Sequence, residues 1–315
     1  MLSSLPGFLV AIISLSLTTI NTAINSLLIV FFSLLKLLIP IPAISRRMGR
    51  MANLFMQNWL RGNALVLRLA NRIDWEIVDH SQLNAAGWHL IICNHLSWTD
   101  IVIIGDLFRT RLPVPKFFLK RELLYVPFVG LACWGLDMPF MHRYSREFLI
   151  KHPELRGKDV ESTRIACAKF VHDPTTVINF VEGTRFTPEK ARQVKSPYQH
   201  LMPPKAAGLS LALAGLGEQF EKIVNVTLAY PDNSEHPFRD LLCGRMKRIQ
   251  VCIDEIAITP ELRGDYVNDK PFKRNFQLWL NQIWQEKDEQ LAAMAHGEFK
   301  SGPVKSSGTE PSQTP

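Results

Sequence analysis

The chain has 315 residues, enough to bury one large hydrophobic core or two modest ones. Apolar residues make up 47% of it and charged residues 21%, which is ordinary for a globular protein, so a membrane segment must show in how the residues are distributed. The five cysteines are odd in number and have no CxxC spacing, which favours a reducing compartment and argues against disulfides or a cysteine metal site.

The formal net charge of +7 is confined to the first quarter of the chain. Seven basic residues precede Asp74, the first acidic one; removing those seven from the 36 Lys and Arg leaves 29, equal to the 29 Asp and Glu. A basic excess beside an apolar N-terminus favours an anionic membrane surface over nucleic acid. We therefore expect anionic lipids as partners and no nucleic acid. The seven residues are Lys36, Arg46, Arg47, Arg50, Arg61, Arg68 and Arg72.

Residues 1–42 are expected to form a hydrophobic membrane anchor. The first 35 residues carry no charge, but Asn21, Thr22 and Asn25 interrupt the apolar run. A membrane-crossing helix needs about 20 apolar residues, so two topologies stay open: one span over the second half, or a helical hairpin that turns at the interruption. A signal peptide is disfavoured because no basic residue precedes the run and no A-x-A-like site follows it. The arginines that follow predict an integral membrane protein with its next domain on the cytoplasmic face, at the inner membrane in a bacterium.

Residues 43–72 have the pattern of a basic amphipathic helix. Two placements stay open: in the membrane interface with its arginines at lipid phosphates, or packed on the core of the following domain with a solvated basic face. The polar stripe is Arg50, Gln57, Arg61, Arg68 and Arg72, largely opposite Met51, Phe55, Trp59, Val66 and Leu69.

Residues 73–296 alternate short apolar runs with helical stretches, which predicts an α/β domain. The expected strands are Trp75–Val78, His89–Cys93, Val177–Val181, Ile223–Tyr230 and Ile249–Ile253. The expected helices follow His95, cover Val160–His172, begin near Lys205, and cover Phe272–Ala295. Residues 297–315 have almost no apolar side chains and are predicted to be disordered.

The segment Asn94–Asp100 (NHLSWTD) joins the apolar run before it to the expected helix after it. His95 and Asp100 are about 500° apart on a regular helix, so they meet only if His95 lies in the turn and Asp100 in the first helical turn. Such a pair suits a general base and the carboxylate that orients it. A plainer interpretation is a capping box, in which Ser97 caps the helix and Asp100 returns the hydrogen bond. From these residues alone the cap is favoured.

Two further segments carry polar residues in similar positions. Val181 ends an apolar run and is followed by Glu-Gly-Thr-Arg, where Arg185 has the fork geometry that grips phosphate. Lys120 and Arg143 offer two more cations for an anionic ligand. Taken alone, each segment is better explained as an ordinary surface turn or a solvated basic face.

Taken together, these motifs resemble a known family. NHxSxxD, KxELxxxPxxG, a hydrophobic segment that closes at Arg143, EGTR and a basic Pro/Gly segment occur in this order, from about Trp75 to Ile256. The chain thus resembles the lysophosphatidate (1-acylglycerol-3-phosphate) acyltransferases, the HX4D glycerolipid acyltransferases. Val181 departs from the proline often found before EGT, and residues 140–142 and 224–226 also depart from the usual pattern, which leaves the acceptor open.

The resemblance implies a single domain with a mixed sheet flanked by helices behind an N-terminal membrane helix pair. It also implies that His95 is the catalytic base and Asp100 its partner. The substrates would be acyl-CoA and a lysophospholipid, with no cofactor and no metal. The residues implied to bind substrate are Lys120, Arg143, Glu182, Gly183, Thr184 and Arg185.

The expected reaction is acyl transfer from acyl-CoA to the sn-2 hydroxyl of lysophosphatidate, which gives phosphatidate for phospholipid synthesis. Remodelling of lyso-phosphatidylglycerol or lyso-cardiolipin is the alternative, and an inactive membrane-tethered scaffold is a weaker one. A Ser–His hydrolase built on Ser97 is disfavoured because the G-x-S-x-G elbow is missing, and metal hydrolysis because there is no HExxH-like spacing.

Overall fold

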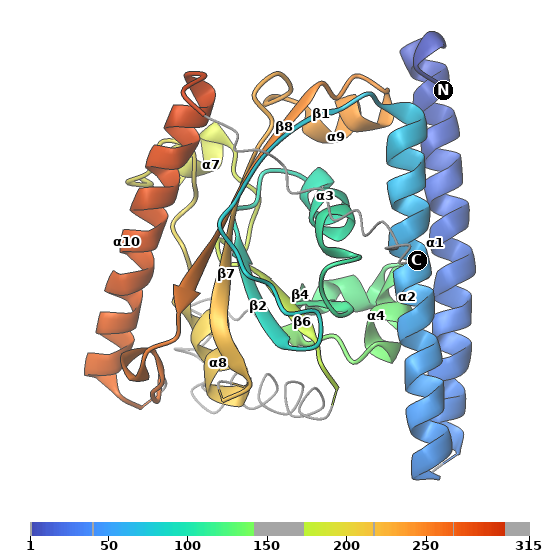
Figure 1. The fold of residues 1–315 in the computed structure, drawn as a ribbon, viewed down its shortest axis with the longest axis horizontal. Helices are drawn as coiled ribbons and strands as arrows, with labels where there is room; N and C mark the ends of the chain where they lie inside the picture. Colours follow the sequence, from blue (N-terminus) through green and yellow to red (C-terminus); the bar gives the residue numbers. More distant parts are fainter. Residues whose placement is uncertain (1, 40, 142–172, 217, 267, 300–315) are drawn as a thin grey trace, which may run out of the picture.

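The computed structural model describes the chain except for residues 1, 40, 142–172, 217, 267 and 300–315. Its centre is a six-stranded sheet with the order β1-β8-β7-β2-β6-β3 and helices on both faces (Figure 1). The β7–β8 pair is antiparallel and the other neighbouring pairs are parallel. The predicted α/β class with a mixed sheet is therefore confirmed. The strands are β1 (Asp74–Asp79), β2 (Trp88–Cys93), β3 (Pro115–Phe117), β6 (Thr176–Phe180), β7 (Phe220–Ala229) and β8 (Arg248–Ala257).

The five expected strands are all present, and β3 is the strand of this sheet that the sequence did not predict. Its three residues, Pro-Lys-Phe, are too few and too mixed for a strand pattern. The helix after the His95 turn is α3 (Thr99–Phe108), and the other two described predictions are α8 (Ala206–Leu216) and α10 (Lys270–Ala295). The helix expected at Val160–His172 and nearly all of the expected disordered tail lie outside the described residues.

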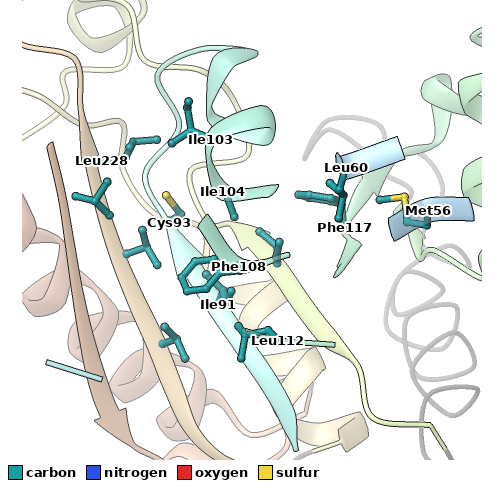
Figure 2. Close-up of a cluster of buried hydrophobic side chains, with 14 of the residues drawn as sticks. Met56, Leu60, Ile91, Cys93, Ile103, Ile104, Phe108, Leu112, Phe117 and Leu228 are labelled. Atoms are coloured by element: carbon teal, nitrogen blue, oxygen red, sulfur yellow. The ribbon is translucent and has the colours of Figure 1, made fainter. Parts of the chain in front are cut away.

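Strand β2 lies in the middle of the sheet and separates two hydrophobic cores. Because successive side chains in a strand point to opposite faces, Ile91 and Cys93 pack toward α2 (Pro42–Ala70) and α3, as Figure 2 shows. Leu90 and Ile92 pack toward α8 and α10. All four side chains are completely buried, so the carboxyl end of β2 is held rigidly from both sides.

The N-terminal segment forms one long helix, α1 (Gly7–Leu38), which runs antiparallel to α2 (Figure 1). The hairpin turn considered at Asn21–Asn25 is therefore wrong, because the chain stays helical there and turns after Leu38 instead. Within the described residues, α1 is the one helix that is long and apolar enough to cross a membrane, by length and composition. The membrane anchor itself stays a prediction.

The polar residues of α1 bind α2 instead of forming a turn. The Asn21 side-chain amide donates to the Trp59 carbonyl at 2.9 Å and to Asn63 Oδ1 at 3.0 Å. The Trp59 indole N–H donates to Thr22 Oγ1 at 3.0 Å. In an apolar helix such groups stabilise contact with a second helix, because each one needs a hydrogen-bond partner. The polar interruption is thus the seam of the helix pair, and α2 in turn packs its apolar face on the sheet domain.

Candidate active site

The site forms where β2 and β6 end side by side. These strands are parallel neighbours, and Cys93 at the end of β2 is paired with Phe180 at the end of β6. The residues that follow each strand therefore emerge at the same edge of the sheet, which is the usual position of sites in parallel sheets. The NHLSWTD and EGTR segments, almost ninety positions apart in sequence, are brought together by this register.

Asn94 fixes the first residue after β2. Its side-chain amide donates to the Leu228 carbonyl at 2.9 Å, and its Oδ1 accepts from the Leu228 amide at 2.9 Å. Both bonds go to the backbone of β7. The side chain of Asn94 therefore continues the hydrogen bonding between β2 and β7 beyond the last residue of β2. The asparagine of the motif is thus a structural clamp, a role that its position before His95 did not reveal.

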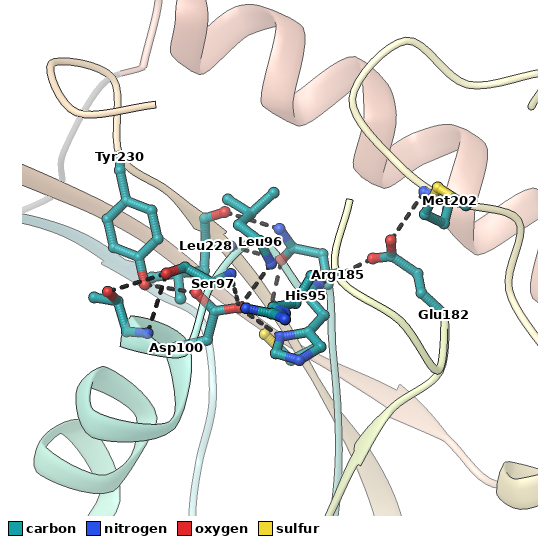
Figure 3. Close-up of polar contacts among 12 residues, drawn as sticks. His95, Leu96, Ser97, Asp100, Glu182, Arg185, Met202, Leu228 and Tyr230 are labelled. Carbon is teal, nitrogen blue, oxygen red and sulfur yellow. Dashed lines mark hydrogen bonds and ion pairs between the residues drawn. The ribbon is translucent and has the colours of Figure 1, made fainter. Parts of the chain in front are cut away.

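His95 and Asp100 are in direct contact, as the sequence predicted for a base and its partner. His95 Nδ1 lies 2.8 Å from Asp100 Oδ2 (Figure 3). The same oxygen accepts the backbone N–H groups of Leu96 at 2.7 Å and Ser97 at 2.9 Å, so it acts as an acceptor and Nδ1 must supply the proton. This arrangement fixes the tautomer of the neutral imidazole and leaves Nε2, on the opposite edge of the ring, without a proton.

The ring of His95 is also positioned by stacking. It lies on the Phe180 ring with centroids 4.2 Å apart and planes inclined by 23°. The His95 side chain is 15% exposed, whereas that of Asp100 is completely buried. The imidazole is therefore partly open to solvent, whereas the carboxylate behind it is not.

The capping box is formed in part. Asp100 returns its bond to the Ser97 amide, but Ser97 Oγ accepts from the Thr99 amide at 3.3 Å, while the Asp100 amide donates to the Ser97 carbonyl at 3.2 Å. Asp100 therefore closes the start of α3 and orients His95 with one oxygen. One carboxylate therefore both orients the His95 ring and caps the helix.

Tyr230 is a member of the site that the sequence did not reveal. It directly follows β7, and its hydroxyl donates to Asp100 Oδ1 at 2.8 Å (Figure 3). The Tyr230 side chain is buried, and burial together with the adjacent Asp100 carboxylate raises the pKa of its hydroxyl well above the ordinary value. The phenol therefore stays protonated and remains a donor to Asp100. Its distance of 130 positions from Asp100 gave no sequence pattern that links the two.

Glu182 binds protein rather than solvent. It is 0% exposed, and its two carboxylate oxygens accept the backbone N–H groups of His95 at 3.0 Å and Met202 at 2.9 Å. Burial raises the pKa of Glu182 to about 8, against the opposing effect of these two bonds. The sequence placed Glu182 among the substrate-binding residues, but in this structure its side chain positions the backbone that carries His95.

The rest of the EGTR segment forms a tight turn beside the His95 turn. Gly183 has φ of +69°, in the left-handed region that glycine adopts without a steric penalty. The turn lets the Phe186 amide donate to the His95 carbonyl at 2.8 Å. The Arg185 guanidinium lies 5.1 Å above the exposed Trp98 ring, a cation–π contact beside the His95 turn. Thr184 Oγ1 lies 3.5 Å from Lys190 Nζ.

Of the other two predicted cations, Lys120 lies within the described residues. Lys120 is exposed in the short strand β4 (Leu119–Lys120), which pairs with β5 (Phe140–Met141) in a separate two-stranded sheet. Arg143 lies outside the described residues. Of the predicted phosphate ligands, the structure brings Arg185 to the His95 turn.

A buried lysine supports the site from the opposite face of the sheet. Lys287 of α10 is 1% exposed and donates to the Val226 carbonyl at 2.6 Å and to Thr227 Oγ1 at 3.0 Å. Burial lowers the pKa of Lys287 to about 8. These contacts fix the backbone of β7 directly before Leu228, the residue to which the Asn94 side chain is hydrogen-bonded.

A group of possible metal ligands lies apart from the His95 pair. In the described part of the chain, His80, Cys252 and Asp254 bring possible ligand atoms within 4.8 Å of one another. They belong to the β1–β8 side of the sheet, where His80 Nδ1 and Asp254 Oδ1 already bond at 2.7 Å. This cluster is separated from β2 by strand β7, so no ion held there would contact His95.

Comparisons with known proteins relate the chain to acyltransferases. A model of the Acyltransferase family matches residues 75–224. Lysocardiolipin acyltransferase 1 of Mus musculus is 27% identical over 222 residues, 66% of this chain and 54% of that protein. 1-Acyl-sn-glycerol-3-phosphate acyltransferase gamma of Homo sapiens is 26% identical over 185 residues, 55% of this chain and 44% of that protein. The chain thus spans about half the length of the curated relatives it matches.

A solved structure shows the same fold. The 1-acyl-sn-glycerophosphate (LPA) acyltransferase PlsC of Thermotoga maritima superposes with a TM-score of 0.54 at 14% identity, over 91% of this chain and 96% of that one. The His95–Asp100 pair and the EGTR turn both lie within the range that the family model matches. The chain therefore contains a region, residues 75–224, that matches the Acyltransferase family model.

Proposed function

We propose that the protein is an acyl-CoA-dependent O-acyltransferase that acylates the sn-2 hydroxyl of lysophosphatidate and releases phosphatidate. The observation that carries this proposal is the 2.8 Å contact between His95 Nδ1 and a fully buried Asp100. A thioester is already activated, so the reaction requires a base beside the acceptor hydroxyl and no covalent enzyme intermediate.

In the proposed mechanism, His95 Nε2 removes the proton from the acceptor hydroxyl while the hydroxyl oxygen attacks the thioester carbonyl carbon. Asp100 stabilises the imidazolium that forms. The tetrahedral intermediate then collapses, the carbon–sulfur bond breaks, and CoA leaves as a thiol after it takes the proton back from His95. The base is thereby restored, and each proton is accounted for within one turnover.

Arg185 is proposed to bind the phosphate of the acceptor. Arg185 is exposed and lies over the Trp98 ring. Among the described residues it forms no ion pair with a carboxylate, so its charge is available to an anion. Lys120 and Arg143 are proposed to contribute to the same anionic group. Binding of the phosphate would place the sn-2 hydroxyl at His95 and lower the entropic cost of the reaction.

A lyso-cardiolipin or lyso-phosphatidylglycerol acceptor is the second candidate. It is favoured by the similarity to lysocardiolipin acyltransferase 1 of Mus musculus. Both acceptors present a phosphate and a free glycerol hydroxyl, so the same base and the same arginine would serve either one. The acceptor identity is therefore a matter of the headgroup beyond the phosphate.

The proposal predicts acyl transfer that depends on His95. The full chain purified in detergent should acylate lysophosphatidate when it is supplied with acyl-CoA, and His95→Ala should lower kcat by at least about 100-fold because the base is gone. Mass spectrometry over a panel of lysolipids identifies the acceptor. His236→Ala, an exposed histidine before α9 (Pro237–Leu242), is the matched control and should retain activity. Wild-type rates in His95→Ala would contradict the mechanism.

Tyr230→Phe should reduce kcat about tenfold and leave the KM for the acceptor unchanged. The substitution removes one donor from a buried carboxylate, a loss of about 1–3 kcal/mol that falls on the orientation of His95 rather than on substrate binding. Tyr198→Phe is the matched control, since the Tyr198 hydroxyl donates to the Asn281 carbonyl instead. A kcat equal to that of the control would show that Tyr230 does not position Asp100.

Arg185→Ala should raise the KM for a phosphate-bearing acceptor about tenfold or more and change kcat less, because a charge-assisted contact to phosphate contributes about 1.5–3 kcal/mol. Arg192→Ala, on the neighbouring helix α7 (Pro188–Gln193), is the matched control. An unchanged KM in Arg185→Ala would assign the phosphate to other residues.

A further inference from the structure

An exposed apolar surface lies outside the site, on η2 (Arg121–Tyr125) and α4 (Val129–Gly135). Exposed patches of large apolar side chains mark surfaces that bind a protein or a membrane. Tyr125 is 77% exposed and Leu131 54%. The η2–α4 surface consists of Tyr125, Val126, Phe128, Val129, Leu131 and Trp134.

The backbone holds these side chains outward in one arrangement. Gly130 lies so close to the preceding turn that a Cβ there would be 2.0 Å from the Leu124 carbonyl oxygen. Phe128 has φ of +62°, a conformation that bulky residues adopt rarely. The amides of Val129 and Gly130 donate to the carbonyls of Pro127 and Val126 at 2.7 and 2.9 Å. The proline and the glycine of the KxELxxxPxxG segment thus hold the η2–α4 surface in one fixed backbone conformation.

The η2–α4 surface adjoins the apolar helix α1, because α4 lies beside α1 (Figure 1). A Cβ on Gly135 would be 2.4 Å from Ser33 Oγ, so the two backbones approach closely. Lys36 Nζ and Asp137 Oδ2 form an ion pair at 2.7 Å just beyond this contact. The second half of α1 also exposes large apolar side chains, namely Leu27, Phe31, Leu34, Leu37 and Leu38.

Exposed cations accompany this combined apolar surface. Two of them, Lys120 and Arg121, directly precede the η2–α4 surface in the chain. Three more are exposed in the first turns of α2, after the end of α1, namely Arg46, Arg47 and Arg50. Tyrosine, tryptophan and basic residues around an apolar surface are the composition of proteins at a membrane–water interface. An anionic lipid leaflet matches both the apolar and the charged parts, whereas a protein partner would need acidic groups placed to match them.

We infer that the η2–α4 surface inserts into the same lipid leaflet as α1, so that the domain rests on the bilayer at a second segment and Lys120 lies at the level of the lipid phosphates. A lysophospholipid would then reach the domain from within the leaflet. This contact is a property of the surface alone and does not depend on the identity of the acceptor.

Quenching of tryptophan fluorescence by brominated lipid tests the insertion directly. The full chain is placed in nanodiscs made of phosphatidylglycerol and phosphatidylcholine, with ordinary or acyl-brominated chains. Bromine in the acyl region should quench part of the emission, and Trp134→Phe should remove a measurable share of that quenching. Trp279→Phe, on α10 at the far side of the domain, should leave the quenched emission unchanged. Equal quenching in Trp134→Phe and wild type would overturn the inference, and it is also the result that a protein partner predicts.

An activity measurement separates this inference from the proposed reaction. Leu131→Asp should lower transfer to a long-chain acceptor in nanodiscs about tenfold and leave transfer to a monodisperse short-chain acceptor unchanged. Leu278→Asp introduces the same charge at a 56% exposed leucine of α10 and should affect neither. An equal loss of transfer to both acceptors in Leu131→Asp would overturn the inference, since a defect in the site or the fold would explain it. Absence of transfer by the wild type would count against the proposed function, while the quenching result would still decide the insertion.

Discussion

The carboxylate of Asp100 is the interaction on which the site depends. It accepts hydrogen bonds from the backbone amides of Leu96 and Ser97, from the Tyr230 hydroxyl, and from His95 Nδ1. A carboxylate that is completely buried needs such donors, because an unpaired charge away from water is strongly unfavourable. The same four bonds start helix α3, join it to the end of β7, and orient the imidazole. The geometry of the His95–Asp100 pair is therefore built from the contacts that make the fold stable at this point.

The sheet explains why these groups meet. Parallel pairing of β2 with β6 and with β7 places three strand ends at one edge, and each end supplies a different element of the site. The end of β2 leads to His95, the end of β6 leads to Glu182, and the end of β7 leads to Tyr230. Asn94 and Glu182 then hold the backbone of the turn between neighbouring strands. Because each of these side chains is buried and bonded to backbone, the turn has little freedom to move away from its position beside Asp100.

The sequence predicted the elements well where hydrophobic patterns are strong, and it predicted the site where residues lie close in the chain. The apolar runs predicted five strands. The spacing of His95 and Asp100 alone favoured a helix cap, and the family resemblance of the ordered motifs implied that the two residues form a pair. Tyr230 and the clamp made by Asn94 depend on strand order and register, which no local pattern encodes. Glu182 was assigned to substrate because it belongs to the EGTR block of the family that the sequence resembles, whereas the structure buries its side chain against backbone amides. Asn21 and Asn25 were considered as a turn, although their spacing of four residues also places them on one face of a helix, where they bind α2.

The tautomer of His95 tests the role of Asp100 most directly. The full chain carries nine histidines, so the His95 signals in a ¹⁵N-histidine spectrum are identified by their loss in His95→Gln. In the neutral ring, the contact with Asp100 predicts a proton on Nδ1 and an unprotonated Nε2 that is able to act as the base. A neutral His95 with its proton on Nε2 would contradict the mechanism, because that nitrogen could not accept the hydroxyl proton of a substrate.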